Sequence, residues 1–154
     1  MTLQEILIEL RSLTGIPDLT LDAQTRACRL IFGEEHEVEF EEVGSTEGGM
    51  FFIHAIVGPL PRSSPAAVFV DLLIAGLFGL ETGSASFGYD DVREELVIFQ
   101  RFDPRHTDMD VFTRELESFL AVLKSRKRKL VDGVSVLTLG GQANSLEYLS
   151  AVRG

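Results

Sequence analysis

The sequence predicts an α+β protein, a two-layer sandwich in which an antiparallel sheet carries helices. Segments with alternating apolar side chains follow one another through short turns, and this succession favours antiparallel pairing. Apolar residues at helical spacing open and close the chain. Between them, Pro65–Leu80 is apolar around its whole circumference, so it must be covered on two sides. The predicted element order is α-β-β-β-β-α-β-β-α.

Composition limits the kinds of partner. The chain has 154 residues, which favours a single domain, and 45% of them are hydrophobic, enough for a core. The formal net charge is −10, which argues against nucleic acid and anionic membranes as partners. Cys28 has no second cysteine to pair with, which fits a reducing cytoplasm. The first residues have no basic region before an apolar run, so we expect no signal peptide.

The first helix is predicted from its cap and its apolar spacing. Thr2 and Glu5 form a capping box. Gly15 and Pro17 end the helix. Its apolar residues are Leu3, Ile6, Leu7, Leu10 and Leu13. They predict an amphipathic helix that packs on the sheet, and the alternative is that part of this stripe stays available to a partner.

Four strands are expected next. They are Leu19–Asp22, Arg26–Phe32, His36–Val43 and Met50–Val57. In the third, Val38 and Phe40 alternate with glutamates, which predicts one buried face and one solvated acidic face.

The central helix is predicted over Pro65–Leu80. Ser63 or Ser64 caps it, and Gly79 or Gly83 ends it. The run is too short to span a membrane, and Asp71 places a charge in its middle. The sheet can cover one side of this helix, and we expect a second copy of the chain to cover the other.

The second half closes the sheet and ends in a long helix. Ser84–Tyr89 and Glu95–Phe102 form a hairpin, and Thr107 or Asp108 caps the helix. The basic run Lys124–Lys129 is expected at the helix end, where the helix dipole favours cations. The predicted domain covers residues 1–130, and residues 131–154 form a C-terminal extension with a helical turn near Ser145–Val152.

No motif for catalysis, metal or cofactor binding is found. His36, His54 and His106 have no partner at ligand spacing. Ser86 lies in a loose match to a nucleophile elbow, but Ser84 stands where glycine is needed. We therefore expect a non-enzyme without cofactor, catalytic residue or metal site.

The pattern resembles the class I type III secretion chaperones, the Tir-chaperone (CesT-like) family. The resemblance covers about residues 1–130. The segments that carry it are the Leu-rich first helix ending at Gly15, Leu19–Asp22 with Cys28-Arg29-Leu30, Phe51–Val57 followed by Gly58-Pro59-Leu60-Pro61, the Leu72-Leu73 helix, Gly83–Tyr89, Glu95–Phe102 and the last helix with Phe112, Leu116 and Phe119. Two departures are Gly76, where the family often has Asn, and the longer tail.

The resemblance implies a small acidic homodimer in the bacterial cytoplasm. Such a protein binds the non-globular N-terminal segment of a secreted effector and keeps it soluble and ready for export, without ATP. The residues expected to contact the effector are Leu3, Leu7, Leu10, Leu30, Phe32 and Phe52. The residues expected at the dimer interface are Val68, Phe69, Leu72, Leu73 and Phe87.

Two other classes of function stay open at this point. An immunity-type module of the same shape would use its acidic charge to bind a folded basic partner. A small enzyme would need a nucleophile–base pair or metal ligands, which the sequence does not present. A peptide from the partner's N-terminus would suffice for a secretion chaperone but not for an immunity-type module.

Overall fold

The computed structural model describes residues 1–17, 19–33, 35–44, 49–62 and 64–139, with side chains as far as Asp132. Three α-helices and a five-stranded antiparallel sheet confirm the α+β class. The elements are α1 (Leu3–Thr14), β1 (Ala27–Phe32), β2 (His36–Val43), β3 (Met50–Pro59), α2 (Pro65–Gly76), the 3-10 turn η1 (Leu77–Gly79), β4 (Ser86–Asp90), β5 (Glu95–Phe102) and α3 (Met109–Leu139).

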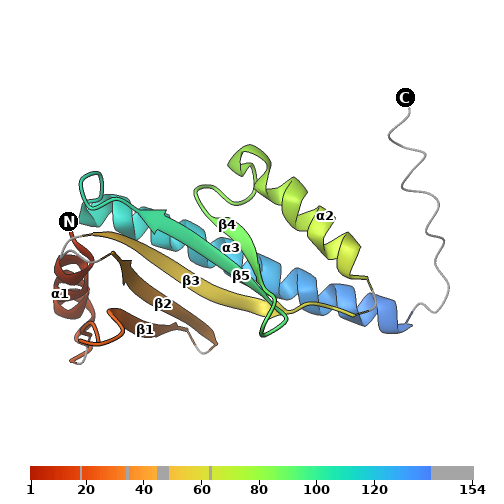
Figure 1. Cartoon of the computed structure of the whole chain (residues 1–154), viewed down its shortest axis with the longest axis horizontal. Helices are drawn as coiled ribbons and strands as arrows, with labels where there is room; N and C mark the ends of the chain where they lie inside the picture. Colours follow the sequence, from red (N-terminus) through yellow and green to blue (C-terminus); the bar gives the residue numbers. More distant parts are fainter. Residues whose placement is uncertain (18, 34, 45–48, 63, 140–154) are drawn as a thin grey trace.

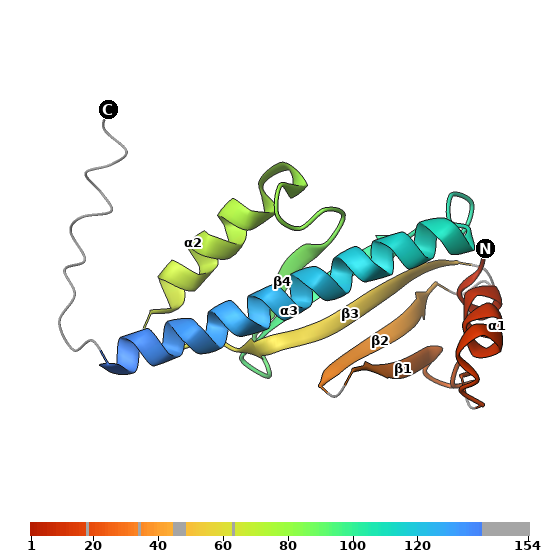
Figure 2. The same cartoon turned by 180° about the vertical axis from the view of Figure 1, so that it is seen from behind.

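The strands lie in the order β1-β2-β3-β5-β4, and every neighbouring pair is antiparallel. The registers place Phe40 opposite Ile53, and Ala55 opposite Ile98, so the buried residues of β2, β3 and β5 share one face. α3 runs along that face, with α1 at one end of the sheet and α2 beyond the β4 side (Figures 1 and 2). None of the helices in the described residues lies over the opposite face of the sheet (Figures 1 and 2).

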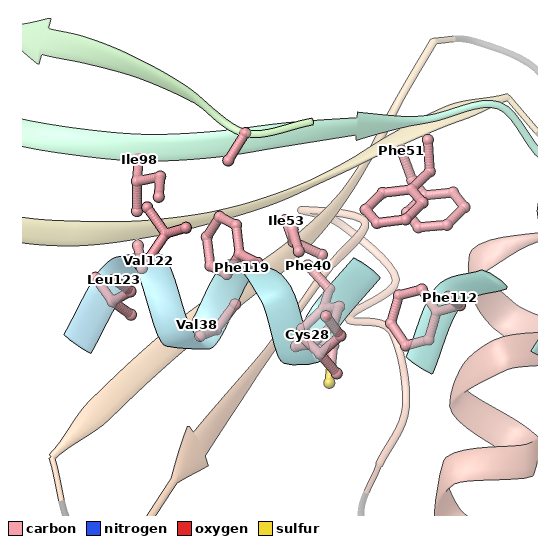
Figure 3. Packing of buried hydrophobic residues seen from close by; sticks show 14 of the residues in the cluster. Cys28, Val38, Phe40, Phe51, Ile53, Ile98, Phe112, Phe119, Val122 and Leu123 are labelled. Carbon is pink, nitrogen blue, oxygen red and sulfur yellow. The ribbon is translucent and has the colours of Figure 1, made fainter. Parts of the chain in front are cut away.

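Aromatic rings dominate the core between the sheet and α3. Phe51 and Phe102, from adjacent strands, stack with centroids 5.0 Å apart. Phe112 of α3 packs against Phe40, Phe51 and Phe102 at 5.5–6.2 Å (Figure 3). Further along α3, Phe119 and Leu123 are fully buried. These contacts fix α3 on the sheet through apolar burial and ring packing.

The predicted capping of two helices is confirmed. The hydroxyl of Thr2 accepts a hydrogen bond from the Glu5 amide, and the Glu5 carboxylate accepts one from the Thr2 amide. At the start of α3, Asp108 Oδ1 accepts a hydrogen bond from the Val111 amide at 2.8 Å, so Asp108 is the cap. α1 ends at Gly15, whose φ of 71° is left-handed.

The predicted strand Leu19–Asp22 is wrong. Asp22 Oδ1 accepts hydrogen bonds from the amides of Gln24 and Thr25 at 2.8 and 2.7 Å. The Asp22 amide donates to the Ala27 carbonyl at 2.9 Å, which closes a turn in front of β1. Local side-chain hydrogen bonds thus outweigh the short apolar alternation. Leu19 is buried in the core, and Leu21 packs against it partly buried.

The predicted end of the last helix near Lys124–Lys129 is also wrong, because α3 continues to Leu139. The basic run therefore lies inside the helix and does not neutralise its C-terminal dipole. The division at residues 130 and 131 stays a prediction. The helical turn expected near Ser145–Val152 lies outside the described residues.

Candidate functional site

The exposed apolar face of α2 and η1 is the most unusual surface of the described chain. Only Leu72 and Ala75 of α2 are buried. Leu73 is 75% exposed and Phe78 is 91% exposed. The other exposed apolar side chains on this surface, called the α2 face below, are Val70, Ile74, Leu77 and Leu80. Exposed apolar residues gathered in this way are typical of surfaces that contact another protein or a ligand.

A groove of about 530 Å³ separates the α2 face from β4. Leu73 and Leu77 line it from the helix side, and Phe87 and Tyr89 line it from β4. Phe69 closes one wall by packing edge-on against Tyr89, with ring centroids 5.6 Å apart. The groove is open and mostly apolar, so it can receive side chains from a partner.

Arg126 of α3 holds α2 in place. Its side chain is 4% exposed, and its guanidinium donates hydrogen bonds to Asp71 at 2.6 Å and to Glu81. It also lies over the ring of Phe87, 5.8 Å from the centroid. This charged contact connects α3 to α2 and to the turn after η1, so it sets where the α2 face stands.

Four of the five residues predicted for the dimer interface line this groove: Phe69, Leu72, Leu73 and Phe87. The fifth, Val68, is half-buried and packs against the core cluster. Of these five, Leu73 is the most exposed. The structure thus brings four of the five predicted dimer residues together around one groove.

The six residues predicted for effector binding lie in three different places. Leu3 and Leu7 of α1 are 0% and 1% exposed and belong to the core. Leu10, Leu30 and Phe32 are half-buried at the edge of the same core, on α1 and β1. Phe52 points to the open face of the sheet, because its neighbours Phe51 and Ile53 point to α3.

The open face of β1 and β2 is acidic and carries several ion pairs. Arg29 Nη2 lies 2.7 Å from Glu39 Oε2, and this hydrogen bond raises the pKa of the Arg29 guanidinium. His54 Nε2 lies 3.5 Å from Glu41 Oε2. No group of three or more metal-ligating side chains occurs among the described residues. The alternation of β2 explains this face as a charged, solvated surface, as the sequence predicts.

Two features of the site were missed by sequence reasoning. One is the buried side chain of Arg126, although Asp71, as the lone charge in an apolar run, signals a basic partner. The other is the extension of the apolar surface past the helix end. There Phe78 adopts a φ of 55°, which turns the chain and leaves its ring in solvent.

The fold and these surfaces define a small two-layer α+β protein with a large apolar contact surface. A profile of the Tir chaperone protein (CesT) family matches residues 5–126, and the chain belongs to that family. The family is one of chaperones, and membership confirms the resemblance read from the sequence.

Solved structures of low identity show the same fold. A chain of the ExsC–ExsE complex superposes with a TM-score of 0.66 at 19% identity, covering 83% of this chain and 96% of that one. A chain of the HopA1–SchA chaperone–effector complex superposes with a TM-score of 0.65 at 11% identity, covering 80% of this chain and 91% of that one. A chain of the complex between the Yersinia pestis type III secretion chaperone SycH and a fragment of YscM2 superposes with a TM-score of 0.60 at 12% identity. The superposition covers 79% of this chain and 97% of that one.

A Chlamydia pneumoniae protein, CPj0713/CpB0740, is 36% identical over 69 residues. The aligned part is 44% of this chain and 52% of that protein, so the match spans about half the length of the relative. Within the part of the chain that the structure describes, no helix is both long and apolar enough to cross a membrane.

Proposed function

We propose that the protein is a cytoplasmic type III secretion chaperone, active as a homodimer. It binds the non-globular N-terminal segment of a secreted effector and keeps that segment soluble and competent for export. The observation that carries the proposal is the exposed α2 face in a member of a chaperone family. No nucleotide is required, because holding an extended segment involves no work cycle.

The proposed dimer buries the α2 face against a second copy. Leu73, Ile74 and Phe78 are each more than half exposed, and water contact at such apolar side chains is unfavourable. A two-fold axis beside α2 would place each copy's helix near the groove of the other, a self-complementary arrangement. Leu73, Phe69 and Phe87 are the proposed anchors, with Val68 and Leu72 supporting them from the core side.

The proposed effector contacts are the half-buried Leu10, Leu30, Phe32 and Phe52. β1 is an edge strand of the sheet, and an extended peptide can add a strand to such an edge. Leu3 and Leu7 would act indirectly, because they anchor α1 to the core beneath Leu10. An effector segment that contacts both α1 and the open sheet face would have to wrap around the chaperone, and a non-globular segment can do so.

The test begins with a tagged chain expressed in its native bacterium, followed by mass spectrometry of the proteins that co-purify. The proposal expects a dominant large partner that is retained through a fragment limited to its N-terminal segment. The Phe52→Asp variant should lose this partner, whereas Val92→Asp, in the exposed β4–β5 turn, should retain it. Retention that requires a folded domain of the partner would overturn the proposal in favour of an immunity-type module.

A further inference from the structure

The basic run of α3 has no role as a helix end, so its position needs another explanation. Lys124 is exposed and Lys127 is half-buried. The side chain of Arg128 is 84% exposed. All three lie in the interior of α3, more than two turns before its last residue, Leu139. The chain has a net charge of −10, so three neighbouring cations on one helix form a locally basic region in an acidic protein.

These cations border an apolar groove of about 660 Å³ between α3 and the end of β3. Val57 and Pro59 line it from β3, and Leu130 lines it from α3. Gly58 lies between the two β3 residues, and a Cβ there would come within 2.8 Å of Leu130 Cδ2. The glycine therefore lets α3 approach β3 closely and shapes the apolar side of the groove. We call this groove, with its rim of Lys124, Lys127 and Arg128, the basic groove.

The contacts within the chain leave the groove positively charged. Lys127 Nζ donates to the Glu35 carbonyl at 3.3 Å, and a carbonyl does not neutralise an ammonium group. Arg128 Nε lies 3.6 Å from Asp132 Oδ2, an exposed i,i+4 pair that is worth little. Glu35 and Asp132 supply the carboxylates of the lining, against three cations. The charge of the groove is therefore +1, counting three cations and two carboxylates.

The basic groove is only partly inside the segment matched by the family, because five of its eleven lining residues follow residue 126. The family match ends at residue 126. Lys127, Arg128 and Leu130 come after that point and are supplied by the continuation of α3. The groove therefore depends in part on residues that the family match does not include, and none of the residues proposed for effector contact lines it.

We propose that the basic groove docks an acidic amphipathic segment of a second protein partner, distinct from the effector. Carboxylates of that segment contact Lys124, Lys127 and Arg128, and its apolar side chains lie against Val57 and Leu130. This inference does not depend on the proposed function, since it concerns a separate surface. A protein fits better than a nucleic acid, because nucleic acid offers phosphates and no aliphatic side chains for the apolar part. Glu35 and Asp132 would also repel a phosphate backbone.

The test uses the full chain and two short fluorescein-labelled peptides, one with Leu and Glu at helical spacing and one with Lys in place of Glu. Fluorescence anisotropy at two salt concentrations should show binding of the acidic peptide, weakened by salt, and little binding of the basic one. The double variant Lys124→Glu/Lys127→Glu should lower the affinity for the acidic peptide by about tenfold. The matched control is Arg62→Glu, a charge reversal at a side chain that is 95% exposed and does not line the groove.

Five outcomes would overturn the proposal. Equal binding of both peptides, or no effect of the double variant, would remove the basic groove as the site. If Phe52→Asp lowered the affinity for the acidic peptide as much as the double lysine variant, the peptide would be bound on the proposed effector surface. Tighter binding by a chain ending at residue 139 would make the chain's own last residues the occupant. Preferential binding of a single-stranded oligonucleotide would replace the protein partner with nucleic acid.

Discussion

Arg126 in α3 donates a hydrogen bond from Nη1 to Oδ2 of Asp71 in α2 at 2.6 Å, and the two ends of this bond lie in different environments. The side chain of Arg126 is 4% exposed, whereas that of Asp71 is 54% exposed. Glu81, the second acceptor, is 53% exposed. A buried guanidinium is thus hydrogen-bonded to two carboxylates that still contact water. The loss of the acids and the loss of the base should therefore have different consequences.

Asp71→Asn/Glu81→Gln should lower the free energy of unfolding by about 3–5 kcal/mol, because it leaves a buried guanidinium without a charged partner. Arg126→Met should cost about 1–2 kcal/mol, since both carboxylates can hydrate and Lys129 stays within 3.7 Å of Glu81. Urea unfolding at one fixed protein concentration measures both. Arg93→Met, which breaks an exposed pair with Asp90, is the control and should cost less than about 1 kcal/mol. Equal costs for the first two variants would contradict this account.

Leu73→Asp should abolish self-association and leave the fold intact. Leu73 is 75% exposed, so the change removes contact area for a second copy without opening the core. Leu72→Asp should lower stability as well, because Leu72 is 9% exposed. Sedimentation velocity and circular dichroism separate the two effects. A dimer that persists in Leu73→Asp would rule out the α2 face as the interface.

Phe52→Asp and Leu7→Ala should separate binding from stability. Phe52 is on the open face of the sheet, so its substitution should weaken the effector complex by at least about tenfold and change stability little. Leu7 is 1% exposed, and Leu7→Ala should cost about 2–4 kcal/mol. Titration calorimetry with the captured N-terminal segment, next to urea unfolding, gives both quantities. Intact effector binding in Phe52→Asp would remove the open face from the site.

Gly58→Ala should destabilise the protein by about 2 kcal/mol. Gly58 has a φ of 153° at an irregularity in the β3–β5 pairing, and the new Cβ would meet Leu130. In a Leu130→Ala background the added cost should be smaller, because only the backbone strain remains. Gly76→Ala is the matched control, since no atom lies within 4 Å of its added Cβ and its φ is −76°. The comparison is made by thermal unfolding, and equal effects at the two glycines would contradict it.

Stability should fall as the pH drops below about 4. The side chain and amide of Arg105 donate hydrogen bonds to Asp103 and hold the pKa of that carboxyl well below its usual range. Backbone amides of turns likewise lower the pKa of Asp22 and Asp90. A pKa that is lower in the folded state than in the unfolded state contributes stability above the unfolded pKa, and this stability is lost as the pH falls toward the folded pKa.

Urea midpoints at about pH 6 and about pH 3 measure this dependence. Asp103→Asn should start lower at the higher pH and lose less on acidification than the parent chain. Asp91→Asn, at an exposed aspartate in the β4–β5 turn, is the control and should follow the parent chain. An identical acid response in Asp103→Asn would show that Asp103 is not one of the groups responsible.

Strands with sustained alternation were predictable to the residue. His36–Val43 has the expected bounds, because its apolar–acidic alternation leaves little freedom in where the strand ends. Glu95–Phe102 also has the expected bounds, although its apolar residues supply both faces. Leu19–Asp22 has the same pattern over four residues only, and hydrogen bonds to the Asp22 side chain decide its conformation. A short alternating pattern is therefore not enough to predict a strand, whereas a long one is.

Sites were less predictable than strands, because they depend on which side of an element is covered. Spacing alone puts Leu3, Leu7 and Leu10 on one stripe, but packing against the sheet buries the first two and leaves Leu10 half-buried. The apolar circumference of Pro65–Leu80 indicates a helix, but the predicted end at Gly79 or Gly83 is wrong, because α2 ends at Gly76. The partner of Asp71 lies 55 residues away, and no local pattern reports such a contact.

The sheet order has a consequence for synthesis of the protein. β3 and β5 are neighbours in the sheet, but α2 and β4 separate them along the chain. α3, which covers the apolar face of all these strands, is made last. Until Phe112, Phe119 and Leu123 have left the ribosome, the nascent chain therefore exposes the phenylalanines of β2, β3 and β5. A protein proposed to keep another protein's unfolded segment soluble thus exposes its own apolar face during synthesis, and a truncated product ending before α3 should be insoluble.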